Sequence, residues 1–261
     1  MPKRKSTPRR RSTPRRRKAR RKLNYGKRMN RRSRAIRMFP KTTKVEFTYC
    51  EEITIPNVKA GTVSAPATFN YCLNSLYDPN VSYGGHQPRG FDQWMNIYNK
   101  YTVIGARVKV EPLSRSGGDA EPTTVFGYID DDVNSDVHTM VDIVELNMPG
   151  TKYKYVQIGP NSGAAVKNTT TNPNLYFKVG MKKFFGLSKK TQMFKPTVHG
   201  DSTTLPSTTE LYTGNATHNP LKLCYLRLHT DGVASATPGV FARVTIKYIA
   251  ILHDPKEIGS S

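Results

Sequence analysis

The side chains of this chain that are best suited to chemistry are the cations crowded at its N-terminus. The hexad Ser-Thr-Pro-Arg-Arg-Arg occurs twice, at residues 6–11 and 12–17. Arginine binds phosphate in a bidentate way and can stack on bases. The repeat has no pattern that could read base edges, so we expect sequence-tolerant and salt-dependent binding of nucleic acid. The candidate binding residues are Lys3, Arg4, Lys5, Arg9, Arg10, Arg11, Arg15, Arg16, Arg17, Lys18, Arg20, Arg21, Lys22, Lys27, Arg28, Arg31, Arg32, Arg34, Arg37, Lys41 and Lys44.

The distribution of charge divides the chain in two. Residues 1–44 hold 21 of the 41 Lys and Arg residues and no Asp or Glu, whereas residues 45–261 hold the other 20 against all 19 acidic residues. We therefore expect a basic, disordered arm over 1–44 and a nearly neutral folded domain over 45–261. This division disfavours an enzyme that steers an anionic substrate, because such charge surrounds a folded site. A nuclear localisation signal needs only about 5–8 basic residues, and Lys3–Lys5 and Arg15–Lys22 suit that additional role.

Other chemistry is weakly represented. Asp130, Asp131 and Asp132 form a weak candidate for a Ca²⁺ site, with a solvated loop after a strand as the alternative that we favour. The six histidines show no metal-binding spacing, and Cys50, Cys72 and Cys224 form neither a metal nor a redox motif. No nucleotide-binding or nucleophile motif occurs, so the sequence predicts neither an enzyme nor a cofactor.

The folded domain to which the arm is attached is predicted to consist of β-strands. Alternating or continuous β-branched and aromatic runs, separated by Gly, Pro, Asn and Ser, predict strands at 45–55, 62–72, 101–113, 123–130, 152–158, 175–185, 221–229 and 240–252. Short helices are expected at 91–98 and 139–146, and long connections at 73–100, 131–151 and 186–220. No apolar run is long enough for a transmembrane helix, and the N-terminus does not resemble a secretory signal. Eight strands predict an all-β, eight-stranded jelly-roll sandwich, and another sandwich or barrel topology is the alternative.

Three segments carry a family resemblance. They are Asn74–Pro79 (NSLYDP), Gly85–Trp94 (GHQPRGFDQW) and Tyr98–Gly105 (YNKYTVIG). With the Arg-rich arm and the segment Arg243–Tyr248 (RVTIKY) of the last predicted strand, they resemble the capsid proteins of circovirus-like, Rep-encoding viruses with circular single-stranded DNA. The resemblance implies a jelly-roll subunit, sixty copies in a T=1 icosahedral shell, and an inward arm that packages single-stranded DNA. Sixty arms would neutralise on the order of 1,260 phosphates, a size that suits a small viral genome.

The aromatic residues of the second and third segments can also be interpreted from their spacing, independently of the resemblance. Helical spacing places Phe91, Trp94 and Tyr98 on one face, near Tyr101, and we favour a packing or intersubunit role for these aromatics. The alternative is that Trp94 stacks on a base while Lys100, Arg107 and Lys109 contact phosphates.

The leading hypothesis is thus a capsid protein found in the virion and, during assembly, in the host nucleus. Its expected partners are copies of itself, viral single-stranded DNA and nuclear import receptors, with no membrane insertion. Two alternatives stay open: a cellular nucleic-acid-binding protein with a basic tail, and the capsid protein of a small RNA or satellite virus. Phosphates of DNA and RNA look alike to an arginine tail, and the attachment receptor is not readable from the sequence.

Overall fold

The computed structural model describes residues 39–55, 69–82, 84–115, 122–132, 140–157, 174–188, 211–232 and 240–256. These residues belong to one compact unit that begins at Phe39. Its strands are β1 (Thr42–Ile55), β2 (Phe69–Cys72), β3 (Tyr98–Arg115), β4 (Pro122–Asp130), β5 (Lys152–Gln157), β6 (Leu175–Gly180), β7 (Gly214–Asn215), β8 (Tyr225–Gly232) and β9 (Val240–Pro255). The described connections contain the short helices α2 (Phe91–Met95), α3 (Met140–Glu145) and α4 (Met181–Phe184). No described helix is long and apolar enough to cross a bilayer.

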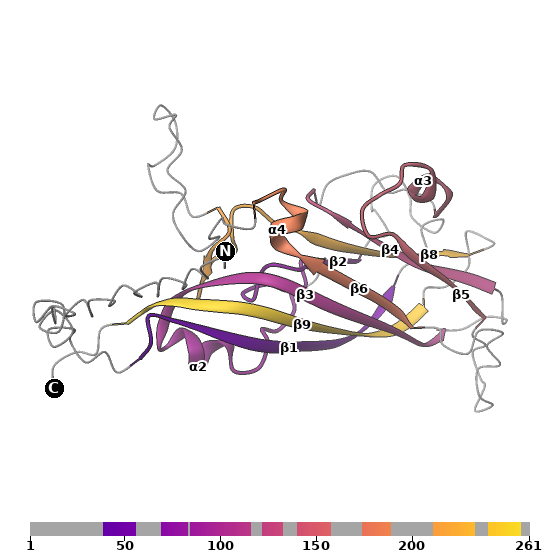
Figure 1. The fold of residues 1–261 in the computed structure, drawn as a ribbon. Helices are drawn as coiled ribbons and strands as arrows, with labels where there is room; N and C mark the ends of the chain where they lie inside the picture. The colour runs from indigo at the N-terminus through magenta and orange to yellow at the C-terminus, as the bar shows by residue number, and fades with distance from the viewer. Residues whose placement is uncertain are drawn as a thin grey trace, which may run out of the picture. The chain divides into compact units, whose positions relative to one another are not determined.

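The strands form two antiparallel sheets (Figure 1). Sheet A has the order β1-β9-β3-β6, with β7 also paired to β3, and sheet B has the order β2-β8-β4-β5. Apart from the two-residue β7, eight strands are therefore divided equally between two sheets, with repeated crossings from one sheet to the other. This is the strand order of a jelly roll, so the predicted fold is confirmed.

The alternation of side chains explains why the two sheets pack together. Along β9, every second residue from Val240 to Leu252 is at most 1% exposed, whereas Arg243 and Lys247 between them are exposed. Since successive residues of a strand point to opposite faces, one face of β9 lies in the core and the other is open. The core between the sheets is filled by residues such as Tyr49, Leu226 and Tyr248, each fully buried.

A smaller apolar cluster lies on the other side of sheet B. Phe126 and Tyr128 of β4 and Ile143 of α3 are fully buried together, with Met140 and Met148 packed against them. Because Val125 and Ile129 of the same strand belong to the main core, Phe126 and Tyr128 point to the outer face. Helix α3 therefore covers part of the outer face of sheet B, as its position in Figure 1 agrees.

Two predicted strands differ at their ends. The strand expected over 175–185 stops at Gly180, and the short helix α4 follows, although Met181 is buried as Leu175 and Phe177 are. The strand expected over 221–229 begins only at Tyr225. Before Tyr225, the side chain of Asn74 occupies backbone groups that a strand partner would otherwise bind. Its amide donates to the backbone O of Lys222 (2.7 Å), and its Oδ1 accepts from the backbone N–H of Cys224 (2.9 Å).

The remaining boundaries agree within a few residues. The sequence did not predict β7, which lies in the connection 186–220 and pairs with Lys100 and Tyr101. Parts of two predicted strands, residues 62–68 and Ile158, lie outside the described residues. The predicted helices are shorter than expected, since α2 ends at Met95 and α3 at Glu145.

Candidate nucleic-acid interface

The basic arm lies almost wholly before the first described residue. Its nineteen basic side chains from Lys3 to Arg37 fall outside the described residues, and their binding of nucleic acid stays a prediction. Lys41 and Lys44 are described and exposed, and Lys44 lies on β1 opposite Ile251 of β9. The arm is thus joined to the body through β1, which stands at the end of the strand order of sheet A.

The side chain of Tyr98 fixes the point where the chain enters β1. Its hydroxyl donates a hydrogen bond to the backbone O of Pro40 (3.1 Å) and lies 2.7 Å from Oγ1 of Thr43. Since a tyrosine hydroxyl has a single proton, Thr43 is the donor in the second contact. Tyr98 is 1% exposed, so a buried side chain from the aromatic motif holds the base of the arm.

Tyr101 organises the first motif, NSLYDP. Its buried hydroxyl accepts hydrogen bonds from the backbone N–H groups of Leu76 and Tyr77, both at 3.2 Å, and lies 3.1 Å from Oγ of Ser75. Phe91, the first residue of α2, meets the Tyr101 ring edge-on with a centroid distance of 5.5 Å. Burial raises the pKa of Tyr101 to about 12. The hydroxyl therefore stays protonated, and it joins the loop, α2 and β3 into one packed unit.

Trp94 differs from these buried aromatics because part of its side chain reaches the surface. It is half-buried between the exposed residues Asp92 and Gln93 and the buried Met95. Its ring lies 6.2 Å from that of Tyr98 at an interplanar angle of 35°. Trp94 thus packs against the core beside Tyr98, and part of its side chain is exposed.

The structure does not bring Trp94 together with all of the predicted phosphate contacts. Arg107 lies nine residues beyond Tyr98 on β3, which corresponds to roughly 30 Å of strand. Lys100 lies opposite His253, six residues along β9 from the Lys247 that faces Arg107, or roughly 20 Å. A base stacked on Trp94 would therefore place its own phosphate far from Arg107, and the four residues are not one site.

Lys109 is paired within the protein. Its Nζ donates to Oε1 of Glu111 at 2.5 Å, and this hydrogen bond raises the pKa of Lys109 above its ordinary value. Arg107 on the same face is exposed, and the register brings Lys178 of β6 and Lys247 of β9 beside it. Sequence reasoning missed these two lysines, because strand pairing over long separations leaves no local signal.

A hydrogen-bonded cluster around the carboxylate of Glu51, which sequence reasoning also missed, lies where the second motif, GHQPRGFDQW, meets the body. Glu51 of β1 accepts hydrogen bonds from the hydroxyl of Tyr49 (2.7 Å) and from Nδ2 of Asn80 (2.9 and 3.1 Å). The imidazole of His86 stacks on the Tyr49 ring with a centroid distance of 4.7 Å. The space is tight, since a Cβ on Gly85 would lie 2.9 Å from both Asn80 and the Tyr49 hydroxyl. This glycine therefore lets the loop approach the sheet.

The weak metal candidate lies at the end of β4. The carboxylate of Asp130 accepts the backbone N–H groups of Asp131 (2.8 Å) and Asp132 (3.3 Å), and Nη1 of Arg227 donates to it at 3.4 Å. Within the described segments, no group of three His, Cys, Asp or Glu residues could hold a metal ion. The Asp130 oxygens thus take part in a turn and in a contact with the buried Arg227.

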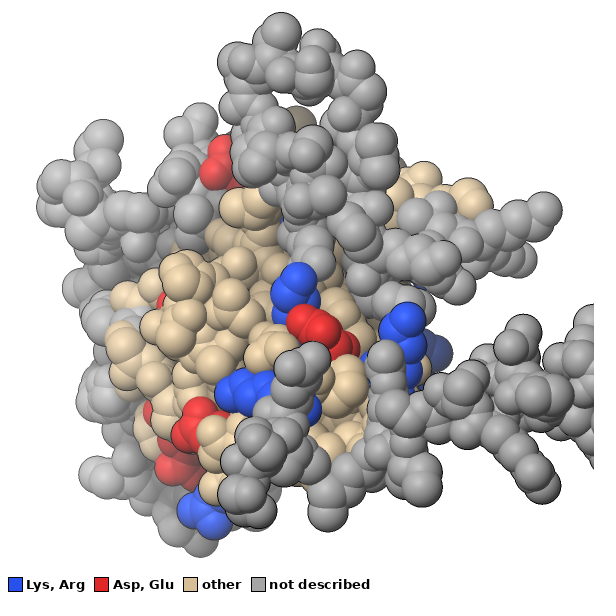
Figure 2. Space-filling model, turned by 90° about the vertical axis from the view of Figure 1, so that its left-hand side faces the viewer, with Lys and Arg blue, Asp and Glu red and all other residues tan. Residues whose placement is uncertain are grey.

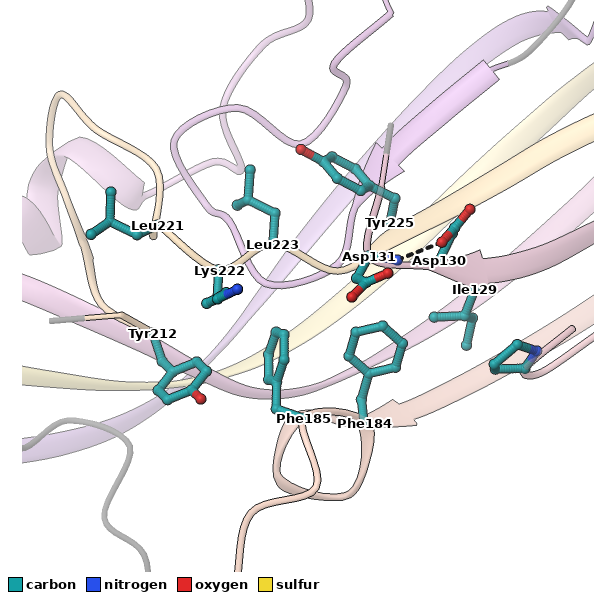
Figure 3. A pocket seen from close by; sticks show the side chains of 11 residues that line it. Ile129, Asp130, Asp131, Phe184, Phe185, Tyr212, Leu221, Lys222, Leu223 and Tyr225 are labelled. Atoms are coloured by element: carbon teal, nitrogen blue, oxygen red, sulfur yellow. Dashed lines mark hydrogen bonds between the residues drawn. The ribbon is translucent and has the colours of Figure 1, made fainter. Parts of the chain in front are cut away.

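Asp130 and Asp131 also line a cavity of about 700 Å³. Figure 3 shows Phe184 and Phe185 projecting into it from the turn after β6, with Asp131 across from them. The ring of Phe185 packs on that of Tyr212 with a centroid distance of 4.9 Å. The sequence did not predict this cavity, because its walls come from four separate stretches of the chain.

Several titratable groups of the described body are buried and held in their neutral form. Burial raises the pKa of the Cys72 thiol to about 12 and that of Tyr128 to about 12, and it also raises the pKa of Cys224. A catalytic nucleophile needs the opposite change, since the deprotonated form attacks. These groups are therefore suited to packing and hydrogen bonding.

Charges of both signs are mixed on the face shown in Figure 2, where Lys and Arg side chains lie beside Asp and Glu side chains. Two such pairs on sheet A are Arg243 with Glu52 at 2.6 Å and Lys247 with Glu46 at 3.9 Å. This mixing agrees with the near balance of charge over residues 45–261.

No protein-family model and no curated protein matches the chain. Among solved structures, it is similar to that of Turnip Yellow Mosaic Virus, with 14% identity and a TM-score of 0.42 over 85% of this chain and 99% of that one. It is similar to the semi-empty VLP of the giant freshwater prawn Macrobrachium rosenbergii nodavirus, with 9% identity and a TM-score of 0.42 over 86% and 100% of the two chains. A T=1 subviral particle of a Penaeus vannamei nodavirus capsid protein deletion mutant is similar at 9% identity and a TM-score of 0.42, over 82% and 98%. The jelly-roll assignment itself rests on the strand order of this chain.

Proposed function

We propose that this chain is the capsid protein of a small, circovirus-like virus with a single-stranded DNA genome. Sixty copies of the body form a T=1 icosahedral shell, and the arms face inward and package the genome. The observation that carries the proposal is the division of charge: 21 cations without a carboxylate on residues 1–44, joined to a jelly-roll body whose charges nearly cancel. A polycation neutralises phosphates whatever their sequence, and a neutral body lets subunits approach without strong repulsion.

An exposed apolar patch on the body supports self-association. Val141, Val144 and Leu146, on α3 and directly after it, are 56%, 47% and 57% exposed. Tyr153 is 46% exposed and lies opposite Phe126 in the register of β4 and β5, which places it on the same outer face of sheet B. Exposed apolar groups gathered on one face mark a protein contact. We assign this α3 patch to a contact between subunits.

The arm also has a second role in this proposal. Lys3–Lys5 and Arg15–Lys22 engage nuclear import receptors, so that assembly takes place in the nucleus of the host cell. The same charge that binds the genome would then carry the newly made subunit to it. Substituting Lys3–Lys5 and Arg15–Lys22 with Gln in a fluorescently tagged chain should move it from the nucleus to the cytoplasm. An unchanged nuclear signal would contradict this role.

Two other functions compete with the proposal, and one experiment separates them. The full-length protein is purified in nuclease-free buffer and viewed by negative-stain microscopy, and its nucleic acid is treated with DNase or RNase. Closed particles whose released nucleic acid is degraded by DNase alone support the proposal. Closed particles with RNase-sensitive cargo indicate an RNA or satellite virus, and monomers that bind duplex DNA indicate a cellular nucleic-acid-binding protein.

The arm itself can be tested by deletion. Because many cations in one lumen repel each other, full-length protein should close into shells only with nucleic acid or at high salt, whereas a chain without residues 1–38 should close without cargo. The absorbance ratio at 260 and 280 nm of sedimented particles measures the cargo. Full-length protein that forms empty shells readily at low salt would contradict the role of the arm.

A further inference from the structure

Three cations lie side by side across sheet A. In the strand register, Arg107 of β3 is opposite both Lys247 of β9 and Lys178 of β6. All three side chains are exposed, whereas Val108, Phe177 and Ile246 next to them are buried in the core. Arg107, Lys178 and Lys247 therefore point to the outer face of the sheet, and we call them the Arg107 row. With strands about 4.8 Å apart, the row spans roughly 10 Å.

The row differs from its neighbours on the same face. Arg243 and Lys109 each have a carboxylate partner within 2.6 Å. Arg107 and Lys178 have no ion-pair partner among the described residues, and Lys247 only approaches Glu46 at 3.9 Å, with both side chains 54% exposed. The row is thus a local excess of positive charge on a body that is otherwise nearly balanced.

This arrangement is unfavourable in the isolated subunit. Like charges directly opposite each other on neighbouring strands repel. The same face can accommodate a carboxylate beside a cation, since Glu52 lies beside Arg243. A bound polyanion would remove the repulsion. The row is therefore a surface whose charge is complementary to phosphates and incompatible with a second copy of itself.

An aromatic side chain completes the surface. Tyr176 lies two residues before Lys178 on β6, shares its face and is 54% exposed. It stands opposite Lys109 of β3 in the register. Cations that contact phosphates, next to an exposed ring on which a base can stack, are the combination by which proteins bind single-stranded nucleic acid without sequence preference.

We propose that the Arg107 row and Tyr176 form a second contact for single-stranded nucleic acid, on the folded body. This inference rests on the proposed function, because it adds a contact on sheet A to the contact that the arm makes with the packaged nucleic acid. The covalent connection favours it: the arm joins sheet A at β1, where Thr48 stands opposite Lys247 at the end of the row. The arm and the Arg107 row can therefore bind the same nucleic acid molecule.

The test uses the full chain and the salt dependence of binding to a fluorescein-labelled oligodeoxythymidylate, measured by anisotropy below the assembly concentration. Each lost phosphate contact lowers the slope of log affinity against log salt by about 0.7 for single strands. Arg107→Gln with Lys178→Gln should therefore lower the slope by about 1.4. Tyr176→Leu should weaken binding about tenfold with an unchanged slope, because it removes stacking and no charge.

The matched control is Lys152→Gln with Lys154→Gln, which removes the same charge from β5 of sheet B. Equal slopes for the two double variants would overturn the inference while leaving the proposed function intact. A wild-type chain that binds no oligonucleotide would overturn the proposed function itself. The Arg107 and Lys178 variant should melt at or above the wild-type temperature, which distinguishes lost contact from misfolding. If it loses affinity for heparin and keeps the wild-type slope for the oligonucleotide, the row binds sulfated glycan and the inference is wrong.

Discussion

The outer faces of the two sheets use the same kind of ion pair in opposite ways. On sheet A, Arg243 and Glu52 lie 2.6 Å apart with side chains 44% and 46% exposed. On sheet B, Arg227 and Asp130 lie 3.4 Å apart with side chains only 1% and 11% exposed. The first pair balances charge on an open surface, whereas the second is a structural part of a covered one. Sheet A thus leaves its ion pair open to its surroundings, whereas sheet B covers its own.

The apolar side chains on the two faces follow the same division. The outer face of sheet B is partly covered by α3, which buries Ile143 against Phe126 and leaves Val141 and Val144 exposed. The outer face of sheet A carries the Arg107 row. One face is suited to another protein surface and the other to a polyanion, as the function that we propose requires.

The largest predicted effect is on assembly, and it tests the contrast between the two sheets at the α3 patch of sheet B. Val141→Asp with Val144→Asp places two carboxylates in the α3 patch, where burying unpaired charge is strongly unfavourable. We expect complete loss of closed particles, with a subunit that still melts as the wild type does, measured by sedimentation and microscopy. Glu145→Ala on the same helix is the control and should assemble normally. Normal particles from the double variant would exclude α3 from the subunit contacts.

The buried and exposed ion pairs should differ next. Asp130→Asn leaves the charge of Arg227 buried beside a neutral amide, and we expect a loss of about 3–5 kcal/mol of unfolding free energy. For a domain of this size that is a fall of about 10 °C or more in melting temperature. Glu52→Gln on sheet A should leave the melting temperature unchanged, because its pair is exposed and screened. Equal effects of the two substitutions would contradict the contrast between the faces.

A smaller effect is expected inside the sandwich. Tyr101→Phe removes the acceptor of two backbone N–H groups, those of Leu76 and Tyr77, and should cost about 1–3 kcal/mol. Because the folded pKa of Tyr101 is raised from 10.0 to about 12, its hydroxyl contributes stability that is complete below pH 10 and is lost as the pH rises toward 12. The stability difference between wild type and variant should therefore shrink over that range in urea titrations. A difference that grows with pH would contradict this role of the hydroxyl.

The smallest effect is expected at Trp94, which separates packing from stacking. Trp94→Leu keeps an apolar side chain against Tyr98 and should lower stability by about 1 kcal/mol. If the ring packs within or between subunits, assembly weakens and the nucleic acid content of each remaining particle is unchanged. Particles that form in normal yield but lose their nucleic acid would assign the ring to base stacking.

Sequence reasoning succeeded where structure is set locally. The alternation from Val240 to Leu252 predicted β9, and the spacing of Phe91, Tyr98 and Tyr101 identified aromatics that are now seen to be buried. It could not find pairings between distant strands, so Lys178 and Lys247 were not associated with Arg107. The register shift between Val103 and Gly105 was also invisible, although it puts Lys100 and Arg107 on the same face despite their odd separation.

Other differences arose from the hydrogen bonds of single side chains. Asn74 bonds to the backbone of Lys222 and Cys224 and so delays β8, although the local sequence is that of a strand. Glu51 likewise binds Tyr49 and Asn80 to form a cluster that no spacing in the sequence announces. Such contacts form only in the folded chain, so the sequence around these residues does not indicate them.

Cryo-electron microscopy of the purified full-length protein, with sequencing of the nuclease-protected nucleic acid that it contains, tests the central claim most directly. We predict closed shells of sixty subunits, with the outer face of sheet A toward density for single-stranded DNA. Dispersed subunits, or shells in which the Arg107 row faces the exterior and no nucleic acid is enclosed, would contradict the account.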